Sequence, residues 1–231
     1  MRHPPHALML FAAGFGTRMG ALTADRPKPL IPVAGRALID HALDLVRAAG
    51  IARVVVNVHY KGDQIIRHLA RQDIAISDES DRILDTGGGL RAALPLLGTD
   101  PVLTLNPDAI WTGANPLRQL RDAWDPARMD ALLLMLPVAQ AAPPSGRSDF
   151  VTDDTGRITR AGAATGMVYL GAQIIATDAL AQIPEPVFSL NRLWDGMIAR
   201  GRAYGLVHQG GWCDVGHPAG IAQAEAMLAH G

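Results

Sequence analysis

A glycine-rich segment near the N-terminus holds the residues with the clearest chemical potential. Residues 12 to 18 read Ala-Ala-Gly-Phe-Gly-Thr-Arg, and Lys28 follows between two prolines. The small residues let the backbone approach a ligand closely. Backbone N–H groups can bind the oxygens of a phosphate chain, and two cationic side chains can offset its charge. The segment therefore predicts a site for a nucleoside triphosphate.

Two common phosphate-binding motifs do not fit this segment. A P-loop ends in Gly-Lys-Ser/Thr, whereas Gly16 is followed by Thr17 and Arg18. A dinucleotide fingerprint needs a third glycine that opens a helix and an acidic residue on the next strand, and neither is evident at the right distance. The glycines alone would more often form an ordinary turn. The prediction therefore depends on the two cations, Arg18 and Lys28.

Two aspartates far apart in the sequence are candidate ligands for a divalent cation. Asp108 follows the apolar run 102–106 and should emerge at the C-terminal end of a strand, where open α/β sheets bind ligands. Asp214 lies between apolar residues, and a carboxylate buried there needs a partner. A magnesium ion prefers such hard oxygen ligands. The alternatives are a turn carboxylate for Asp108 and a helix cap for Asp214.

Strands and helices alternate along the sequence. Apolar, β-branched runs predict strands at 7–11, 53–58, 101–106, 131–137 and 166–170, with a hairpin turn at 153–156. Helical periodicity and capping residues predict helices at 38–49, 62–71, 86–97 (with Thr86 as N-cap), from Asn115-Pro116 onward, and near 177–182, 190–200 and 218–230. Residues 140–148 should form an exposed loop. This order predicts an α/β fold with a Rossmann-like, mostly parallel mixed sheet and helices on both faces.

The composition excludes several classes of protein. The chain has 231 residues, 48% of them hydrophobic, a formal net charge of −1 and one cysteine. A near-zero charge argues against nucleic-acid binding, and a lone cysteine cannot form an internal disulfide or a cysteine-based zinc cluster. No apolar run approaches the length of a membrane span. These features predict a soluble, cytoplasmic protein with no nucleic-acid or membrane partner.

The glycine-rich segment, together with Pro27-Lys28-Pro29-Leu30, resembles the signature of nucleotidyltransferases that activate sugar 1-phosphates. The resemblance extends from Leu8 to about Leu228 and implies a fold of the nucleotide-diphospho-sugar transferase type. It implies a single domain, 1–231, with a nucleotide-binding part at about 1–138 and a sugar-covering part at about 139–231. Two departures are visible: Ala21 and Pro107 stand where many relatives have proline and glycine.

The resemblance also implies the roles of individual residues. The catalytic residues would be Arg18, Lys28 and Asp108, and Asp108 and Asp214 would hold Mg²⁺. The nucleotide-binding residues would be Ala12, Ala13, Gly14, Gly16, Thr17, Arg18, Lys28, Thr86 and Gly87. The sugar-binding residues would be Asn106, Asp149, Thr165 and Gly166, although these could be ordinary turn or strand residues. Three successive glycines, 87–89, suggest the close approach of a ligand, and a loose glycine turn is the alternative.

The resemblance is strongest to the subgroup that uridylylates N-acetylmuramate 1-phosphate in cell-wall recycling. It implies a Mg²⁺-dependent reaction of UTP with this sugar 1-phosphate, which yields a UDP-sugar and pyrophosphate, by a monomer or small homo-oligomer. Two alternatives stay open. One is another substrate pair, such as mannose 1-phosphate with GTP or glucose 1-phosphate with dTTP. The other is a non-catalytic sensor of nucleotide sugars with the same fold.

Overall fold

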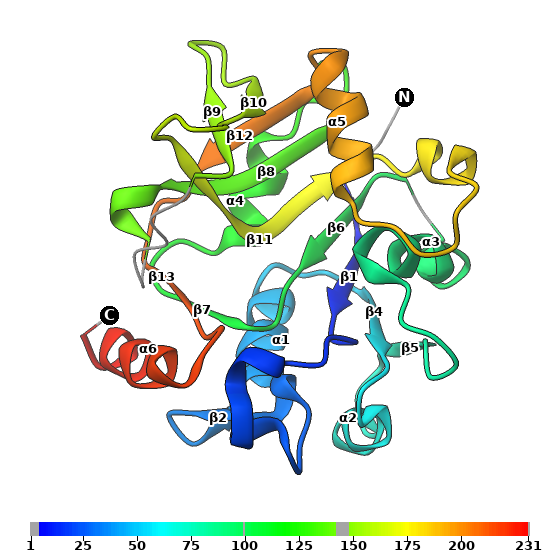
Figure 1. The fold of residues 1–231 in the computed structure, drawn as a ribbon, viewed down its shortest axis with the longest axis vertical. Coiled ribbons are helices and arrows are strands. Elements are labelled where there is room, and N and C mark those ends of the chain that lie inside the picture. Colours follow the sequence, from blue (N-terminus) through cyan, green and yellow to red (C-terminus); the bar gives the residue numbers. More distant parts are fainter. Residues whose placement is uncertain (1–4, 99, 142–147, 231) are drawn as a thin grey trace.

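A computed structural model describes residues 5–98, 100–141 and 148–230 (Figure 1). The strands are β1 (Ala7–Phe11), β2 (Pro32–Val33), β3 (Arg36–Ala37), β4 (Arg53–Val58), β5 (Ala75–Asp78), β6 (Val102–Leu105), β7 (Ala109–Trp111), β8 (Ala131–Pro137), β9 (Phe150–Thr152), β10 (Ile158–Arg160), β11 (Met167–Ile175), β12 (Ala203–Val207) and β13 (Trp212–Asp214). The α-helices are α1 (Leu38–Ala48), α2 (Gly62–Leu69), α3 (Asp85–Leu97), α4 (Pro116–Ala123), α5 (Asn191–Ala199) and α6 (Pro218–His230). The 3₁₀-helices are η1 (Thr17–Thr23), η2 (Lys28–Leu30), η3 (Val138–Gln140) and η4 (Asp178–Gln182).

One mixed sheet of nine strands runs through the described part of the chain. Its main order is β10-β9-β11-β6-β1-β4-β5, and β8 joins β11 to β12. The four strands β6, β1, β4 and β5 are parallel, and β11 runs antiparallel to β6. Because parallel strands end at the same edge of a sheet, the C-terminal ends of β1, β4 and β6 lie together. The predicted mixed, mostly parallel sheet is therefore confirmed.

Helices cover both faces of the sheet, as predicted (Figure 1). Alternate residues of β1 point to opposite sides, so that Leu8 and Leu10 belong to one apolar cluster and Ala7 and Met9 to another. The first cluster also contains buried side chains of α1, α2 and α4. The second contains buried side chains of α3 and α5. The sheet is thus a central layer between two layers of helices.

A third apolar cluster lies at the edge of the sheet that carries the strand ends. It joins Met19 of η1 and Ile31 to Ile110 of β7, Val215 beyond β13, and Ala224 of α6. β7 and β13 form a separate two-stranded ribbon, in which Asp214 pairs with Ala109. Neither strand of this ribbon was expected from the sequence. The ribbon brings the C-terminal segment against the N-terminal glycine-rich loop.

Most of the predicted elements are present, and three differ in detail. Asn115 caps α4 as expected, because its Oδ1 accepts hydrogen bonds from the backbone N–H groups of residues 117 and 118. The predicted N-cap role of Thr86 is wrong: α3 begins at Asp85, and the Thr86 hydroxyl accepts a hydrogen bond from Leu190 N instead. β11 extends to Ile175, well beyond the expected strand at 166–170. Segment 177–182 forms only a 3₁₀-helix. Of the expected loop at 140–148, residues 142–147 lie outside the described residues.

Candidate active site

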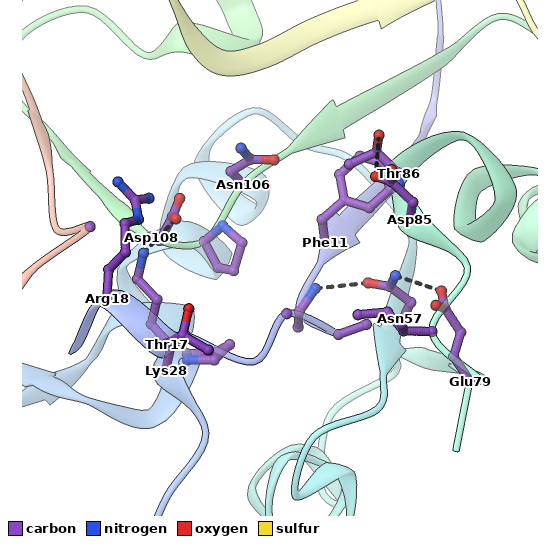
Figure 2. Close-up of a pocket in the computed structure, with 18 residues that line it drawn as sticks. Phe11, Thr17, Arg18, Lys28, Asn57, Glu79, Asp85, Thr86, Asn106 and Asp108 are labelled. Carbon is purple, nitrogen blue, oxygen red and sulfur yellow. Dashed lines mark hydrogen bonds and ion pairs between the residues drawn. The ribbon is translucent and has the colours of Figure 1, made fainter. Parts of the chain in front are cut away.

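A cavity of about 320 Å³ opens at the C-terminal ends of β1, β4 and β6. Its walls come from the glycine-rich loop, η2, the start of α3 and the segment that follows β6 (Figure 2). The lining residues are Phe11, Ala12, Ala13, Gly14, Gly16, Thr17, Arg18, Lys28, Pro29, Asn57, Glu79, Ile83, Asp85, Thr86, Asn106, Pro107, Asp108 and Gly216. Most of the residues predicted from the sequence to bind nucleotide therefore share one cavity.

The backbone of the glycine-rich loop requires glycine at one position in particular. Gly16 has φ 65, in the left-handed region, and a Cβ atom there would lie 2.9 Å from Cβ of Lys28. Glycine thus allows the loop to pack directly against the lysine. The Gly16 carbonyl accepts a hydrogen bond from Met19 N at 2.9 Å, which begins η1. The loop and Lys28 are held in one compact unit on the cavity wall.

A buried polar relay fixes the start of this loop. The side chain of Asn57, on β4, accepts a hydrogen bond from Ala12 N at 2.8 Å and donates one to Glu79 at 2.7 Å. Glu79 also accepts a hydrogen bond from Leu84 N at 2.9 Å. Figure 2 shows Asn57 between the two elements that it joins. The sequence analysis missed both residues, although an asparagine inside the β-branched run 53–58 was a usable signal.

Lys28 and Asp108 form an ion pair inside the cavity. Lys28 Nζ lies 2.7 Å from Asp108 Oδ2, and the side chains are 10% and 30% exposed (Figure 2). Val215 N donates a hydrogen bond of 2.8 Å to the carbonyl of Asp108, which places Asp214 beside it. Burial raises the pKa of Asp214, and the charge of Asp108 raises it further, whereas Lys28 and Arg18 act in the opposite direction. The two predicted metal ligands are therefore brought together.

Arg18 reaches the same place from the glycine-rich loop. A Cβ atom built on Gly216 would lie 2.4 Å from Asp214 Oδ2 and 3.0 Å from both terminal nitrogens of Arg18. The missing side chain at Gly216 thus leaves room for the guanidinium group and the carboxylate. Arg18, Lys28 and Asp108 line one side of the cavity, and Asp214, which does not line it, lies close enough to interact with all three. Two cations and two carboxylates from four separate segments therefore converge there. Such a group can bind a polyanion and a divalent cation together.

The donor set at this wall fits a magnesium ion that is shared with a substrate. Over residues 5–98, 100–141 and 148–230, no three His, Cys, Asp or Glu side chains converge to form a complete protein metal site. Mg²⁺ is usually held by one or two carboxylates and by substrate phosphates. Asp108 and Asp214 supply two carboxylates, and a bound cation would offset the repulsion by which Asp108 raises the pKa of Asp214. The residues present therefore fit the predicted ion.

The three glycines at the start of α3 contact the protein itself. A Cβ atom would lie 2.4 Å from the Phe188 ring at Gly87, 2.3 Å from the Pro186 carbonyl oxygen at Gly88, and 2.6 Å from Glu79 at Gly89. The N–H groups of Gly87 and Gly88 donate to the Phe188 carbonyl. The expectation that these glycines leave space for a ligand is thus corrected: Gly87 and Gly88 admit the segment 183–190, and Gly89 admits the Glu79 side chain. Thr86 lines the cavity, whereas Gly87 does not.

The predicted sugar-binding residues divide into two groups. Asn106 lines the cavity and packs over Gly171, which has φ 82 and lies at an irregularity in β11. Asp149, Thr165 and Gly166 lie away from this cavity, in the region of β9 and the start of β11. Asp149 accepts a hydrogen bond from Tyr169 N at 2.9 Å. A Cβ atom on Gly166 would lie 2.3 Å from the Phe150 carbonyl oxygen, so the glycine allows close packing.

Comparison with known proteins decides the family of the chain. The model of the MobA-like NTP transferase domain matches residues 8–196. The chain belongs to the MobA-like NTP transferase family. This nucleotidyltransferase is 41% identical over 241 residues to the N-acetylmuramate alpha-1-phosphate uridylyltransferase of Caulobacter vibrioides, and the alignment covers 99% of each chain. It is 31% identical over 225 residues to the enzyme of the same name from Neisseria meningitidis serogroup B, covering 95% of this chain and 96% of the relative.

The solved structures agree on the fold. HddC from Yersinia pseudotuberculosis superposes with a TM-score of 0.78 at 19% identity, over 96% of this chain and 99% of that one. The family match and the two relatives confirm the expected membership of the sugar-1-phosphate nucleotidyltransferases and the expected class of enzyme. In the described part of this nucleotidyltransferase, none of the helices has the length and apolarity needed to cross a bilayer.

Proposed function

We propose that the enzyme transfers the uridylyl group of UTP to N-acetylmuramate α-1-phosphate in peptidoglycan recycling. A phosphate oxygen of the sugar attacks the α-phosphorus, the bond from this phosphorus to the bridging oxygen breaks, and UDP-N-acetylmuramate and pyrophosphate form. The observation that carries the proposal is the 41% identity, over 99% of both chains, to an enzyme with this name. The cavity supports it, because two cations and Asp108 line one side of it and Asp214 lies next to them.

Each charged group has a distinct task in this proposal. Backbone N–H groups of Ala13, Gly14, Gly16 and Thr17 and the Arg18 guanidinium bind the β- and γ-phosphates, because these residues line the cavity. Lys28 is only 10% exposed and is held in place by Asp108, so its ammonium is preorganised to offset charge at the α-phosphate. Arg18 stabilises the departing pyrophosphate. Thr86 and Asn106, which also line the cavity, are placed to contact the base or sugar.

Asp108 and Asp214 would hold the magnesium ion. When bound, the ion neutralises phosphate charge and favours an in-line arrangement of the reacting groups. The backbone holds the two carboxylates near each other, because Asp214 pairs with Ala109 in the β7–β13 ribbon and Val215 N donates a hydrogen bond to the Asp108 carbonyl. Pro107, where the family resemblance suggested glycine, also lines the cavity, and the strand end still delivers Asp108 to Lys28.

Pyrophosphate release tests the proposal directly. Purified enzyme with Mg²⁺ is assayed against each of the four common nucleoside triphosphates combined with the 1-phosphates of N-acetylmuramate, N-acetylglucosamine, mannose and glucose. We expect the highest kcat/KM for UTP with N-acetylmuramate 1-phosphate. A clear preference for N-acetylglucosamine 1-phosphate, or for another nucleotide, would contradict the assigned substrates. Release with none of the pairs would instead support a non-catalytic sensor.

A further inference from the structure

Phe15 occupies an unusual position in the glycine-rich loop. Among residues 12 to 18, all of which the structure describes, it alone does not line the cavity. Its ring points the other way, with an edge-on contact to His59 at 5.2 Å between centroids and a tilted contact to Tyr60 at 5.9 Å. The Phe15 side chain is nevertheless 46% exposed. The phosphate-binding loop thus carries, between its two glycines Gly14 and Gly16, an aromatic side chain that is half-exposed and turned away from the cavity.

The turn between β4 and α2 contacts the loop at a second point. Tyr60 Oη donates a hydrogen bond of 2.9 Å to the carbonyl of Thr23, the last residue of η1. The Thr23 hydroxyl in turn donates to the carbonyls of Gly16 and Gly20, at 3.3 and 3.0 Å. One tyrosine therefore contacts the loop tip with its ring and the end of η1 with its hydroxyl.

The residue after Tyr60 supports the position of the tyrosine ring. Lys61 adopts a left-handed conformation with φ 50, which is unfavourable for a residue with a side chain. Its ammonium lies 5.2 Å from the centre of the Tyr60 ring. Asn57, three residues before Tyr60, accepts a hydrogen bond from Ala12 N at the start of the loop. Residues 57–60 therefore contact the segment 12–23 at Ala12, at Phe15 and at Thr23.

We propose that His59 and Tyr60 are positioning residues for the triphosphate loop, acting through Phe15 and Thr23. Resting on the proposed function, this inference assigns them to UTP binding, although neither lines the cavity. The loop has glycines at 14, 16 and 20, and such a backbone loses much conformational freedom when it is ordered. The contacts of Phe15 with His59 and Tyr60, which we call the aromatic clamp, keep the loop in its binding conformation before UTP arrives. Loss of the clamp weakens UTP binding and leaves the chemical step intact.

The experiment compares Phe15→Ala, Tyr60→Phe, Tyr60→Leu and the double variant Phe15→Ala/Tyr60→Leu with wild type. Ile66→Ala serves as the control, because Ile66 is a 39% exposed apolar residue on the adjacent helix α2. We measure kcat, KM for UTP and KM for N-acetylmuramate 1-phosphate. Calorimetry gives the affinity for UTP, and hydrogen exchange reports the opening of residues 12–23.

Phe15→Ala should raise KM for UTP about 10-fold, within the range expected for loss of one aromatic cluster. Tyr60→Phe, which keeps the ring, should raise it only ~3-fold, as expected for one neutral hydrogen bond. Tyr60→Leu should match or exceed Phe15→Ala. The double variant should fall well short of the product of the single effects, because both remove the same contact. The KM for the sugar phosphate and kcat should stay within about twofold of wild type, the scatter expected for independent sites.

Unchanged UTP affinity and unchanged exchange of residues 12–23 in Phe15→Ala and Tyr60→Leu would overturn the positioning role. A lower kcat with both KM values unchanged would overturn it as well, since that result indicates fewer folded molecules. An additive double variant would show that Phe15 and Tyr60 act separately. Failure of the wild type to release pyrophosphate with any substrate pair refutes the proposed function instead, and calorimetry distinguishes the two failures.

Discussion

Replacement of Lys28 by methionine should lower kcat much more than it weakens UTP binding. Lys28 Nζ is 2.7 Å from Asp108, and the lysine side chain is 10% exposed. Solvent therefore screens its charge weakly, and its position is fixed before the substrate binds. Methionine has a similar length and fills the same space without the charge. The change thus removes one preorganised electrostatic contact and little packing.

The size of the effect follows from this geometry. A single preorganised donor aimed at developing charge contributes about 10²–10³-fold to kcat, or ~2.7–4 kcal/mol. Arg18 and the backbone N–H groups of the loop stay in place, so KM for UTP should rise by no more than roughly tenfold, about 1.4 kcal/mol. Asp108 is 30% exposed and can recruit water, so we expect the folded state to lose only about 1–2 kcal/mol.

Single-turnover and steady-state pyrophosphate release separate these two effects, and calorimetry with UTP gives the affinity independently. Arg36→Ala provides the control, because Arg36 is a half-exposed cation that pairs with Asp44 on the surface. A Lys28→Met enzyme with a normal rate at saturating UTP, and only weaker binding, would refute the assignment of Lys28 to the chemical step. An equal loss in Arg36→Ala would show that net charge, not position, matters.

Three further outcomes follow from the site and its supports. Asp214→Asn should reduce turnover at least ~10²-fold at any Mg²⁺ concentration. It should also raise the melting temperature, because it removes a partly buried carboxylate whose pKa is raised by burial and by Asp108. A lower melting temperature in calorimetric scans would contradict this interpretation. Glu79→Ala leaves the buried Asn57 amide and the part-buried Leu84 N–H without their acceptor. It should cost about 1–3 kcal/mol of stability and weaken UTP binding, whereas Glu225→Ala on the surface should change neither quantity. Gly88→Ala would place a methyl group 2.3 Å from the Pro186 carbonyl oxygen and should destabilise the fold by about 1–3 kcal/mol in urea unfolding; wild-type stability would show that segment 183–190 yields easily.

Local sequence determined the core elements of the sheet. The β-branched run at 53–58 and the apolar run at 131–137 match β4 and β8 residue for residue. A buried strand needs a mostly apolar run, which 131–137 has throughout and 53–58 has apart from Arg53 and Asn57. Asn115-Pro116 fixed the start of α4, because the cap is made by neighbours in the chain. The short ribbon of β7 and β13 escaped prediction, since its two strands pair across a hundred residues.

The sequence by itself determined the chemical inventory of this enzyme: a glycine-rich loop, Arg18, Lys28 and two aspartates near apolar segments. Only the tertiary structure decided how these groups face one another, and it alone revealed Asn57 and Glu79 as the support of the loop. It also reassigned the glycines 87–89, because the missing side chains of Gly87 and Gly88 admit the protein's own segment 183–190 and that of Gly89 admits Glu79. The physical reason is common to these cases. Backbone freedom and residue chemistry are local properties, whereas the partner that occupies the space beside a glycine or a buried polar group comes from distant parts of the chain.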